Sequence, residues 1–278
     1  MSRLPRISVV IPSFNQAGFL ARALDSLAAQ QYPALEVIVI DGASTDGTVE
    51  LLESRSDVVT QWVSEPDAGQ TSALNKGYAM ATGEVFGWLN CDERYRAGAL
   101  RRVGATFARI PGLDVAFGHR IVVDIHGNEI GRMRMPAIHP GRYAVYASGL
   151  LFSDTTFWSA EAHRRTGLLD EAGCPRYGMD FDWFARLGLN ARRWRRIDEY
   201  LSEFTEHAGR VTFRVPEMPD IARRIRRKLQ KAAGVGPLEI VALSPVYFVL
   251  SRVGRMGWRG LMRPPSPASV LRVAGVIR

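Results

Sequence analysis

Two hydrophobic patterns alternate along the first 110 residues. Short runs of aliphatic and β-branched residues predict strands at residues 7–12, 36–40, 58–63 and 84–89. Apolar positions at helical spacing follow each run and predict helices at residues 17–30, 48–53, 70–81 and 97–109. The connections between them are short. Alternation of this kind predicts an α/β fold, in which a mostly parallel sheet carries helices on both faces.

The pattern changes after residue 110. A strand at residues 114–118 is followed by two strands, 121–125 and 129–134, on either side of a turn at 126–128. Residues 135–149 are irregular, 160–166 and 181–189 predict short helices, and 195–204 predicts a last strand. From residue 220 the pattern is helical, with an apolar stripe among basic residues: Ile221, Ile225, Leu229 and Ala232. We therefore expect a domain at residues 1–218 and a basic amphipathic helical tail at residues 219–278.

Charge separates these two parts more sharply than hydrophobicity does. Residues 1–191 hold 18 basic and 21 acidic side chains, whereas residues 192–278 hold 18 basic and 7 acidic ones. The 278-residue chain has two cysteines at no metal-binding spacing, and no apolar run long enough to span a bilayer. With no signal-peptide pattern at the start, we expect a cytoplasmic protein whose basic end meets an anionic surface.

Oxygen-bearing side chains follow each of the first four predicted strands. Ser13 and Asn15 follow the first strand, Asp41 the second, Asp67 the third, and Asn90 and Asp92 the fourth. Open parallel sheets bind ligands at the carboxyl ends of their strands, so these side chains belong to one candidate site. No glycine-rich phosphate loop is present. A nucleotide diphosphate beside several carboxylates therefore needs a cation, and oxygen ligands point to Mg²⁺ or Mn²⁺.

The motifs along residues 7–210 resemble those of family 2 glycosyltransferases, which have the Rossmann-like GT-A fold. Residues 7–15 are similar to the family's opening strand, and 39–48 to its second signature. Residues 67–70, 73–77 and 81–84 are similar to the third signature. Residues 90–93 stand where the family has its DxD metal motif, with Asn90 replacing the first aspartate. Residues 178–183 and His207 resemble the family's catalytic motif and its C-terminal histidine.

This resemblance implies a role for each candidate residue. Asp41 and Asp67 would read the base and ribose, Asp92 and His207 would hold Mn²⁺ or Mg²⁺, and Asp180 would be the general base. The implied donor-binding residues are Pro12, Ser13, Asn15, Asp41, Asp67, Gln70, Lys76, Asn90 and Cys91. By contrast, Asp182 is expected to be structural, and Cys91 also fits as a small apolar core residue.

The implied reaction is transfer of a sugar from a nucleotide-sugar donor to a hydroxyl of a glycan or lipid-linked acceptor, with inversion, in cell-surface or secreted polysaccharide synthesis. Two other functions stay open. A sugar nucleotidyltransferase would need a basic, glycine-rich loop after the first strand, but residues 12–18 contain no basic side chain. A nucleotide-sugar-binding protein with little or no activity is suggested by Asn90 and opposed by Asp92 and Asp180.

The basic tail also allows more than one interpretation. Its amphipathic and aromatic-rich composition suits a helix on an anionic membrane, at the inner face. Alternatively, the tail packs on the enzyme domain and leaves a charged face in solvent. A nucleic-acid partner is not expected, because no nucleic-acid-binding motif is present.

Overall fold

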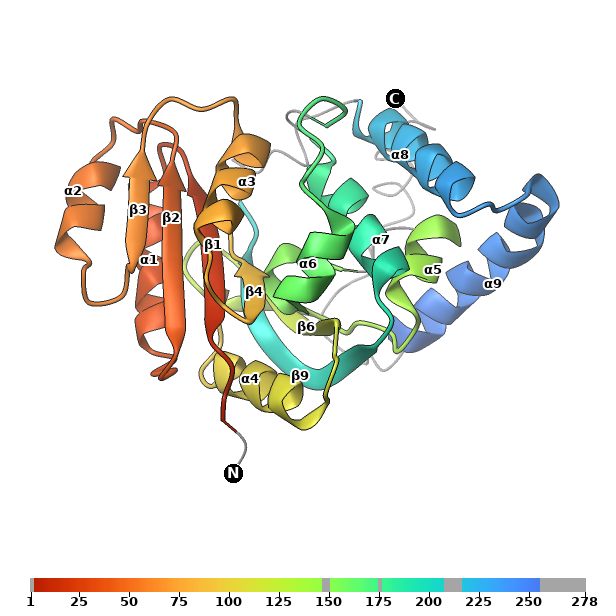
Figure 1. Ribbon diagram of the computed structural model, residues 1–278, viewed down its shortest axis with the longest axis horizontal. Coiled ribbons are helices and arrows are strands. Elements are labelled where there is room, and N and C mark those ends of the chain that lie inside the picture. The colour runs from red at the N-terminus through yellow and green to blue at the C-terminus, as the bar shows by residue number, and fades with distance from the viewer. Residues whose placement is uncertain (1–2, 147–150, 175–176, 208–216, 256–278) are drawn as a thin grey trace.

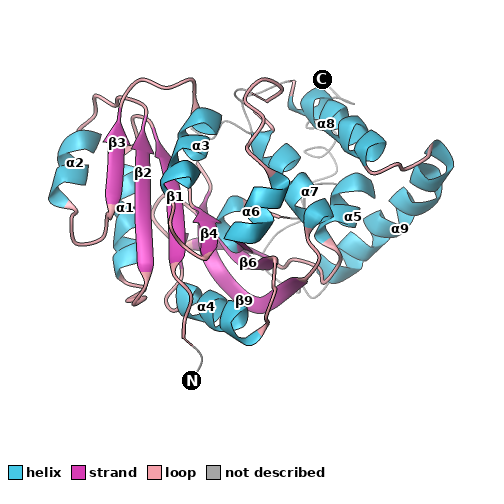
Figure 2. Cartoon of the chain, in the orientation of Figure 1, coloured by secondary structure: helices cyan, strands magenta, loops and turns pink. Residues whose placement is uncertain are grey.

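The computed structural model describes residues 3–146, 151–174, 177–207 and 217–255. Nine strands of this described chain form one sheet, shown in Figures 1 and 2. They are β1 Ile7–Ser13, β2 Leu35–Asp41, β3 Gln61–Ser64, β4 Val85–Trp88, β5 Glu93–Tyr95, β6 Val115–Val123, β7 Glu129–Met133, β8 Thr156–Ser159 and β9 Trp194–Thr205.

The sheet has a parallel half and a mixed half. The order is β3-β2-β1-β4-β8-β6-β9-β5, and β7 pairs with β6. Neighbours from β3 to β4 are parallel, as are β6 and β9, whereas β8, β5 and β7 run antiparallel to their neighbours. The carboxyl ends of β1, β2, β3, β4, β6 and β9 therefore lie at one edge of the sheet.

Helices cover both faces of the sheet, which confirms the predicted α/β architecture. They are α1 Ala17–Ala28, α2 Thr48–Ser54, α3 Gln70–Met80, α4 Ala99–Arg109, α5 Pro140–Tyr146, α6 Ala160–Thr166, α7 Met179–Asn190, α8 Met218–Ala232 and α9 Pro237–Arg255. Side chains of β1 and β2 alternate between two cores, one with α1, α2 and α4 and the other with α3 and α5–α8. Strands buried on both faces explain the continuous apolar runs.

Two strands and one helix, β5, β8 and α5, were not predicted from the sequence. The three-residue β5 and four-residue β8 are too short to show a period, and both lie against strands distant in sequence. Residues 135–149 were expected to be irregular, yet Pro140–Tyr146 form α5. Glycine explains this packing: a Cβ at Gly141 would lie 2.5 Å from backbone atoms of Gly188 and Leu189 in α7. Close backbone approach lets the helix pack on α7, and its side chains Tyr143 and Ala144 join the buried core.

The apolar stripe of α8 packs inward. Ile225 and Leu229 are each 2% exposed and join the core around Trp183, and α8 contacts both α5 and α7 (Figure 1). This stripe is therefore not available to a membrane, which corrects the membrane interpretation for this helix. The next helix, α9, contacts α5. No helix within the described ranges combines the length and apolar character needed to cross a bilayer.

Candidate functional site

The predicted residues at the ends of β1, β2, β3 and β4 meet at the carboxyl edge of the sheet. The Gly42 amide donates to the Ser13 carbonyl at 2.9 Å, which joins the ends of β1 and β2. Ser64 Oγ at the end of β3 donates to Asp41 at 2.7 Å. The Cys91 thiol after β4 lies 3.3 Å from the Pro12 carbonyl oxygen. Loops from four strands thus form one site, as the strand-end argument predicts.

The loops after β1 and β2 hold each other rigidly. Asn15 has φ +50° and its Oδ1 accepts from the Thr45 amide at 2.9 Å. Asp41 is fully buried and accepts from the Ser44 amide and hydroxyl and from Ser64. These three hydrogen bonds use three of the roughly four acceptor positions of the carboxylate, and the complete burial of Asp41 leaves little of it open to a base or ribose.

An exposed aromatic ring adjoins Asp67. Phe14 is 62% exposed, and a Cβ added at Gly42 would lie 3.2 Å from its ring and 3.3 Å from Asp67 Oδ2. Asp67 Oδ1 accepts from the Gly69 amide at 2.7 Å, while Oδ2 has no hydrogen-bond partner among the described residues. Sequence reasoning did not select Phe14, although a large apolar residue between Ser13 and Asn15 in a polar loop was the available signal.

Asn90 serves as a structural centre beneath the site. Its amide oxygen accepts from Gln70 Nε2 and Trp88 Nε1, each at 2.8 Å, and its amide nitrogen donates to Ser153 Oγ at 3.3 Å. Both acceptor positions of the oxygen are therefore occupied by protein donors. An aspartate here would retain these acceptors but could not donate to Ser153, so the replacement of the first motif aspartate has a local structural reason.

Two other predicted donor-binding side chains, those of Cys91 and Lys76, are engaged with the protein itself. Cys91 is 1% exposed, and burial raises the pKa of its thiol to about 12, so the side chain is a neutral core group. Only its backbone is left for contact with a donor. Lys76 in α3 forms an ion pair with Glu65, and both side chains are partly in solvent. Lys76 therefore lies beside Glu65, the charged residue that follows β3 at this edge of the sheet.

Asp92 and His207 come together from positions 115 residues apart. His207 Nε2 lies 3.0 Å from Asp92 Oδ2, and each side chain is less than 15% exposed. The His207 ring also packs on Phe19 of α1, with ring centroids 4.8 Å apart. Two neighbouring ligands of an octahedral ion with bonds of about 2.1 Å are separated by about 3 Å, so this pair fits Mg²⁺ or Mn²⁺.

This pair supplies only part of a coordination shell. No group of three His, Cys, Asp or Glu side chains suited to a metal occurs in the described part of the chain. Mg²⁺ in nucleotide sites commonly takes one or two protein ligands and completes its shell with phosphate oxygens and water. The residues therefore fit a cation that the protein holds together with a diphosphate.

A buried cation supports the segment that carries His207. The Arg120 guanidinium in β6 lies between the rings of Phe152 and Phe204, 3.9 and 4.1 Å from their centroids. It also contacts Asp154 Oδ1 at 3.4 Å, while Asp154 Oδ2 accepts from Ser202 at 2.6 Å. Stacking on both sides fixes Phe204, three residues before His207. Sequence reasoning missed Arg120 because its partners are distant along the chain.

Asp180 and Asp182 differ although both lie in the first turn of α7. Asp182 is fully buried and forms ion pairs with Arg186 at 2.8 Å and Lys228 at 3.3 Å. Asp180 is exposed and accepts from the Phe181 amide at 2.8 Å, with no cationic partner among the described residues. Although water reaches this side chain, the protein packed around it disfavours the charged form and raises the pKa of Asp180, and backbone hydrogen bonds oppose this shift only partly. Asp180 is therefore the carboxylate available to a substrate.

The turn before Asp180 is linked to the nucleotide loops through α3. Thr71 Oγ1, next to Gln70, donates to the Cys174 carbonyl at 3.1 Å, and Asn75 Nδ2 donates to the Leu169 carbonyl at the same distance. On its other side, Gly178 lies against α8. A Cβ at this glycine would lie 2.8 Å from side chains of Ile221 and Ile225. Both α3 and α8 therefore position the first turn of α7.

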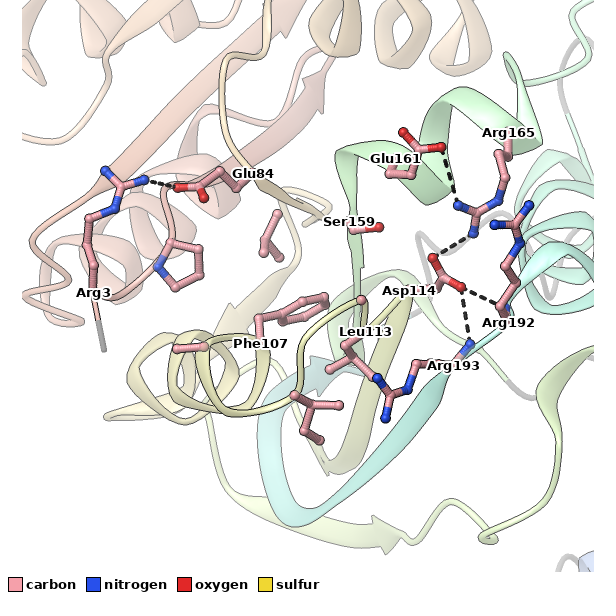
Figure 3. Close-up of a pocket in the computed structure, with 15 residues that line it drawn as sticks. Arg3, Glu84, Phe107, Leu113, Asp114, Ser159, Glu161, Arg165, Arg192 and Arg193 are labelled. Carbon is pink, nitrogen blue, oxygen red and sulfur yellow. Dashed lines mark hydrogen bonds and ion pairs between the residues drawn. The ribbon is translucent and has the colours of Figure 1, made fainter. Parts of the chain in front are cut away.

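A hollow of about 470 Å³ lies at the opposite, amino edge of the sheet (Figure 3). Its carboxylates are all paired with arginines. Arg3 lies 2.5 Å from Glu84, Arg165 lies 2.6 Å from Asp114, and Arg165 also lies 3.5 Å from Glu161. The hollow contains none of the predicted site residues. These ion pairs close the fold where strands begin, and they supply no carboxylate for chemistry.

Comparison with known proteins yields one family. The model of glycosyl transferase family 2 matches residues 8–171. An uncharacterized glycosyltransferase of Nostoc sp. is 34% identical over 106 residues, which are 37% of this chain and 33% of that protein. One from Mycobacterium tuberculosis is 38% identical over 96 residues, 34% of this chain and 37% of that protein. The aligned part thus spans about a third of these curated relatives.

Solved structures share the fold over nearly the whole chain. TarS of S. aureus in complex with UDP-GlcNAc superposes with a TM-score of 0.67 at 17% identity, covering 98% of this chain and 84% of that one. Mannosyltransferase PcManGT from Pyrobaculum calidifontis, in complex with GDP-Man and Mn²⁺, superposes with a TM-score of 0.60 at 18% identity, covering 99% and 81%. At these identities the likeness establishes the GT-A fold alone.

Proposed function

Because the chain belongs to glycosyl transferase family 2, we propose that it transfers a sugar from a nucleotide-sugar donor to a hydroxyl group, with inversion at the anomeric carbon. The observation that carries the proposal is the 3.0 Å approach of Asp92 and His207 beside the loops of β1 to β3. The exposed Asp180 supplies the second function that this reaction needs, a proton acceptor.

Donor binding is assigned to the loops after β1, β2 and β3. Phe14 presents an exposed ring on which a base can stack, and Asp67 Oδ2 can accept from a base or ribose group. Bound Mn²⁺ or Mg²⁺ supplies positive charge to the diphosphate, and Asp92 and His207 are the residues that would hold it. Asn15 and Asp41 keep these loops in place by the hydrogen bonds described above.

Asp180 is assigned the proton transfer. An acceptor hydroxyl attacks the anomeric carbon, the bond from that carbon to the diphosphate oxygen breaks, and the hydroxyl proton passes to the Asp180 carboxylate. A raised pKa makes this carboxylate a stronger base than an ordinary aspartate. Direct displacement from the opposite face inverts the anomeric centre. The proposed acceptor is a glycan or a lipid-linked saccharide, used in cell-surface or secreted polysaccharide synthesis.

The substitution Asp180→Asn tests this assignment. We expect turnover, measured as nucleoside diphosphate release with a panel of saccharide acceptors, to fall by roughly two orders of magnitude or more. Donor affinity, measured by calorimetry with UDP-, GDP- and dTDP-sugars and Mn²⁺, should hardly change. A donor affinity that falls in parallel with turnover would show that Asp180 contacts the donor or the metal instead.

Asp182→Asn is the matched control from the same helical turn. It disrupts the buried pair with Arg186, so we expect a lower free energy of unfolding and a smaller loss of turnover per folded molecule. A larger loss of turnover from Asp182→Asn than from Asp180→Asn would reverse the two assignments.

A further inference from the structure

The helix α9 has one packed face and one exposed face. Tyr146 Oη of α5 donates to Glu239, and the neighbouring Ile240, Leu243 and Ser244 are partly buried. Of the nine positions after Pro237, Glu239 and five apolar residues are exposed; the apolar ones are Leu238, Val241, Ala242, Pro245 and Val246. The three large ones are 87%, 74% and 48% exposed in the order Leu238, Val241, Val246.

Helical geometry places these five residues on one arc. At about 100° per residue, they span about 140° of the helix circumference. The three partly buried residues span about 100° of the opposite side, and the exposed Glu239 borders the apolar arc. The exposed arc carries no charged or hydrogen-bonding side chain. A contiguous apolar face of this kind in solvent indicates an interaction surface. We name it the α9 face.

Charge indicates what covers the α9 face. Residues 217–255 contain eight basic and three acidic side chains, a net charge of +5. On α8, which a short connection joins to α9, the basic residues Arg223, Arg224, Arg227 and Lys231 are exposed, whereas Lys228 is held by Asp170 and Asp182. An apolar helix face beside a cationic helix matches the composition of surfaces that lie in an anionic lipid interface. Each basic side chain near such a surface adds to the attraction.

We propose that the α9 face inserts into an anionic lipid leaflet while the exposed basic residues of α8 contact its headgroups. The buried stripe of α8 takes no part in this contact, because Ile225 and Leu229 hold α8 against the enzyme core. The basic part of this surface lies on α8, the helix whose packed face contacts Gly178, two residues before Asp180. Resting on the proposed function, this arrangement brings the candidate base close to the leaflet and favours a lipid-linked acceptor.

Vesicle binding by the full chain tests the docking surface. We compare vesicles of phosphatidylcholine with vesicles of phosphatidylcholine and phosphatidylglycerol, by flotation. The wild type should bind the second kind, and salt should weaken this binding. The double variant Leu238→Ser/Val241→Ser should bind at least about tenfold more weakly, because two apolar side chains no longer leave water. The matched control Ile130→Ser removes an exposed apolar side chain in β7 and should bind normally.

A second variant separates charge from insertion. Arg223→Gln/Arg227→Gln should weaken binding to the anionic vesicles and reduce its salt dependence, while leaving the α9 face intact. Absence of vesicle binding by the wild type, or equal binding by the wild type and the Leu238→Ser/Val241→Ser variant, overturns the proposal. The proposal is also overturned if light scattering shows that the wild type is a dimer and that the Leu238→Ser/Val241→Ser variant is a monomer. The α9 face would then contact a second copy of the chain.

The same variants keep this inference distinct from the transfer reaction. Leu238 and Val241 lie outside the nucleotide loops, so Mn²⁺-dependent binding of UDP or GDP by the double variant should equal that of the wild type. Loss of vesicle binding with intact nucleotide binding supports docking alone. Failure of nucleotide binding in every variant and the wild type would count against the proposed function and not against the α9 face.

Discussion

Carboxylates at the two edges of the sheet differ in their partners. At the amino edge, Asp114 accepts from the Arg165 guanidinium and from the backbone amides of Arg192 and Arg193, with its side chain almost fully buried. At the carboxyl edge, Asp67 and Asp180 accept from backbone amides and have no cationic partner among the described residues. Removal of a buried carboxylate that is paired with arginine destabilises the fold. By contrast, a carboxylate without a cationic partner at a ligand-binding edge is available to contact a ligand.

The pKa values follow the same division. Burial of Glu36 at the amino edge disfavours its charge, but hydrogen bonds from Ser8 and Thr82 and the charge of Arg6 outweigh burial and lower its pKa. Asp180 experiences desolvation without comparable compensation, so its pKa is raised. The two environments thus shift the same side-chain chemistry in opposite directions, and a raised pKa suits the proton transfer proposed for Asp180.

The largest expected effect comes from Asp92→Ala. We expect turnover to fall by about 10³-fold and Mn²⁺-dependent binding of a nucleoside diphosphate to be lost, because Asp92 is one of two side chains that would hold the cation. The free energy of unfolding should change by less than about 1 kcal/mol. Calorimetry with Mn²⁺ and with EDTA measures the binding of the nucleoside diphosphate. Equal affinity of the wild type in both conditions would contradict the metal assignment.

The opposite result is expected from Asp114→Ala. Loss of this carboxylate leaves two backbone amides without their acceptor and leaves Arg165 with only its longer contact to Glu161, so the free energy of unfolding should fall by roughly 2–4 kcal/mol. Turnover per folded molecule should remain at the wild-type level. Denaturant titration measures the free energy of unfolding, and an activity assay normalised to the folded fraction measures the turnover. If Asp114→Ala instead altered nucleotide affinity and left stability unchanged, the division between the edges would be wrong.

The smallest effect is a separation of activity from stability in mild acid. As the proposed base, Asp180 must be ionised, so turnover should decline as pH falls through the raised pKa of this group, which lies above the usual aspartate value of about 4. The Glu36 pKa is lowered in the fold, so its stabilisation is present above its unfolded pKa and is lost only as pH falls through the lower folded value. Activity should therefore fall while circular dichroism is unchanged.

Asp180→Asn is the control for this pH dependence. Its residual turnover should be flat over the pH range in which the wild type declines. Persistence of the same acid limb in the variant would assign the titration to another group.

Several site features could be predicted from the sequence because they depend on local chain order. Residues that follow consecutive parallel strands must share an edge, and this placed Asn15, Asp41 and Asp67 together before any contact was known. Individual contacts could not be predicted in this way. Nothing local indicates that Asn90 uses both acceptor positions on Gln70 and Trp88, or that Phe14 stands exposed beside Gly42.

The two C-terminal helices show where sequence reasoning stops. The sequence shows an apolar stripe among basic residues in α8, whereas the start of α9 is apolar on nearly all sides, so pattern alone does not say which face of α9 is covered. The stripe of α8 is buried because Gly178 leaves room for Ile221 and Ile225, whereas α9 has one face against α5 and its apolar face in solvent. Which face is covered depends on the shape of the neighbouring surface.

The sequence by itself determined the alternation of strands and helices, the family and the candidate residues, because periodicity and short motifs are encoded in neighbouring positions. Tertiary structure alone decided that Asp92 meets His207 and that Arg120 stacks on Phe204 in the segment that carries His207. It also decided that Asp180 is exposed while Asp182 is paired. These contacts join residues on separate elements, so they depend on how the sheet is ordered and packed, and no local pattern encodes that geometry.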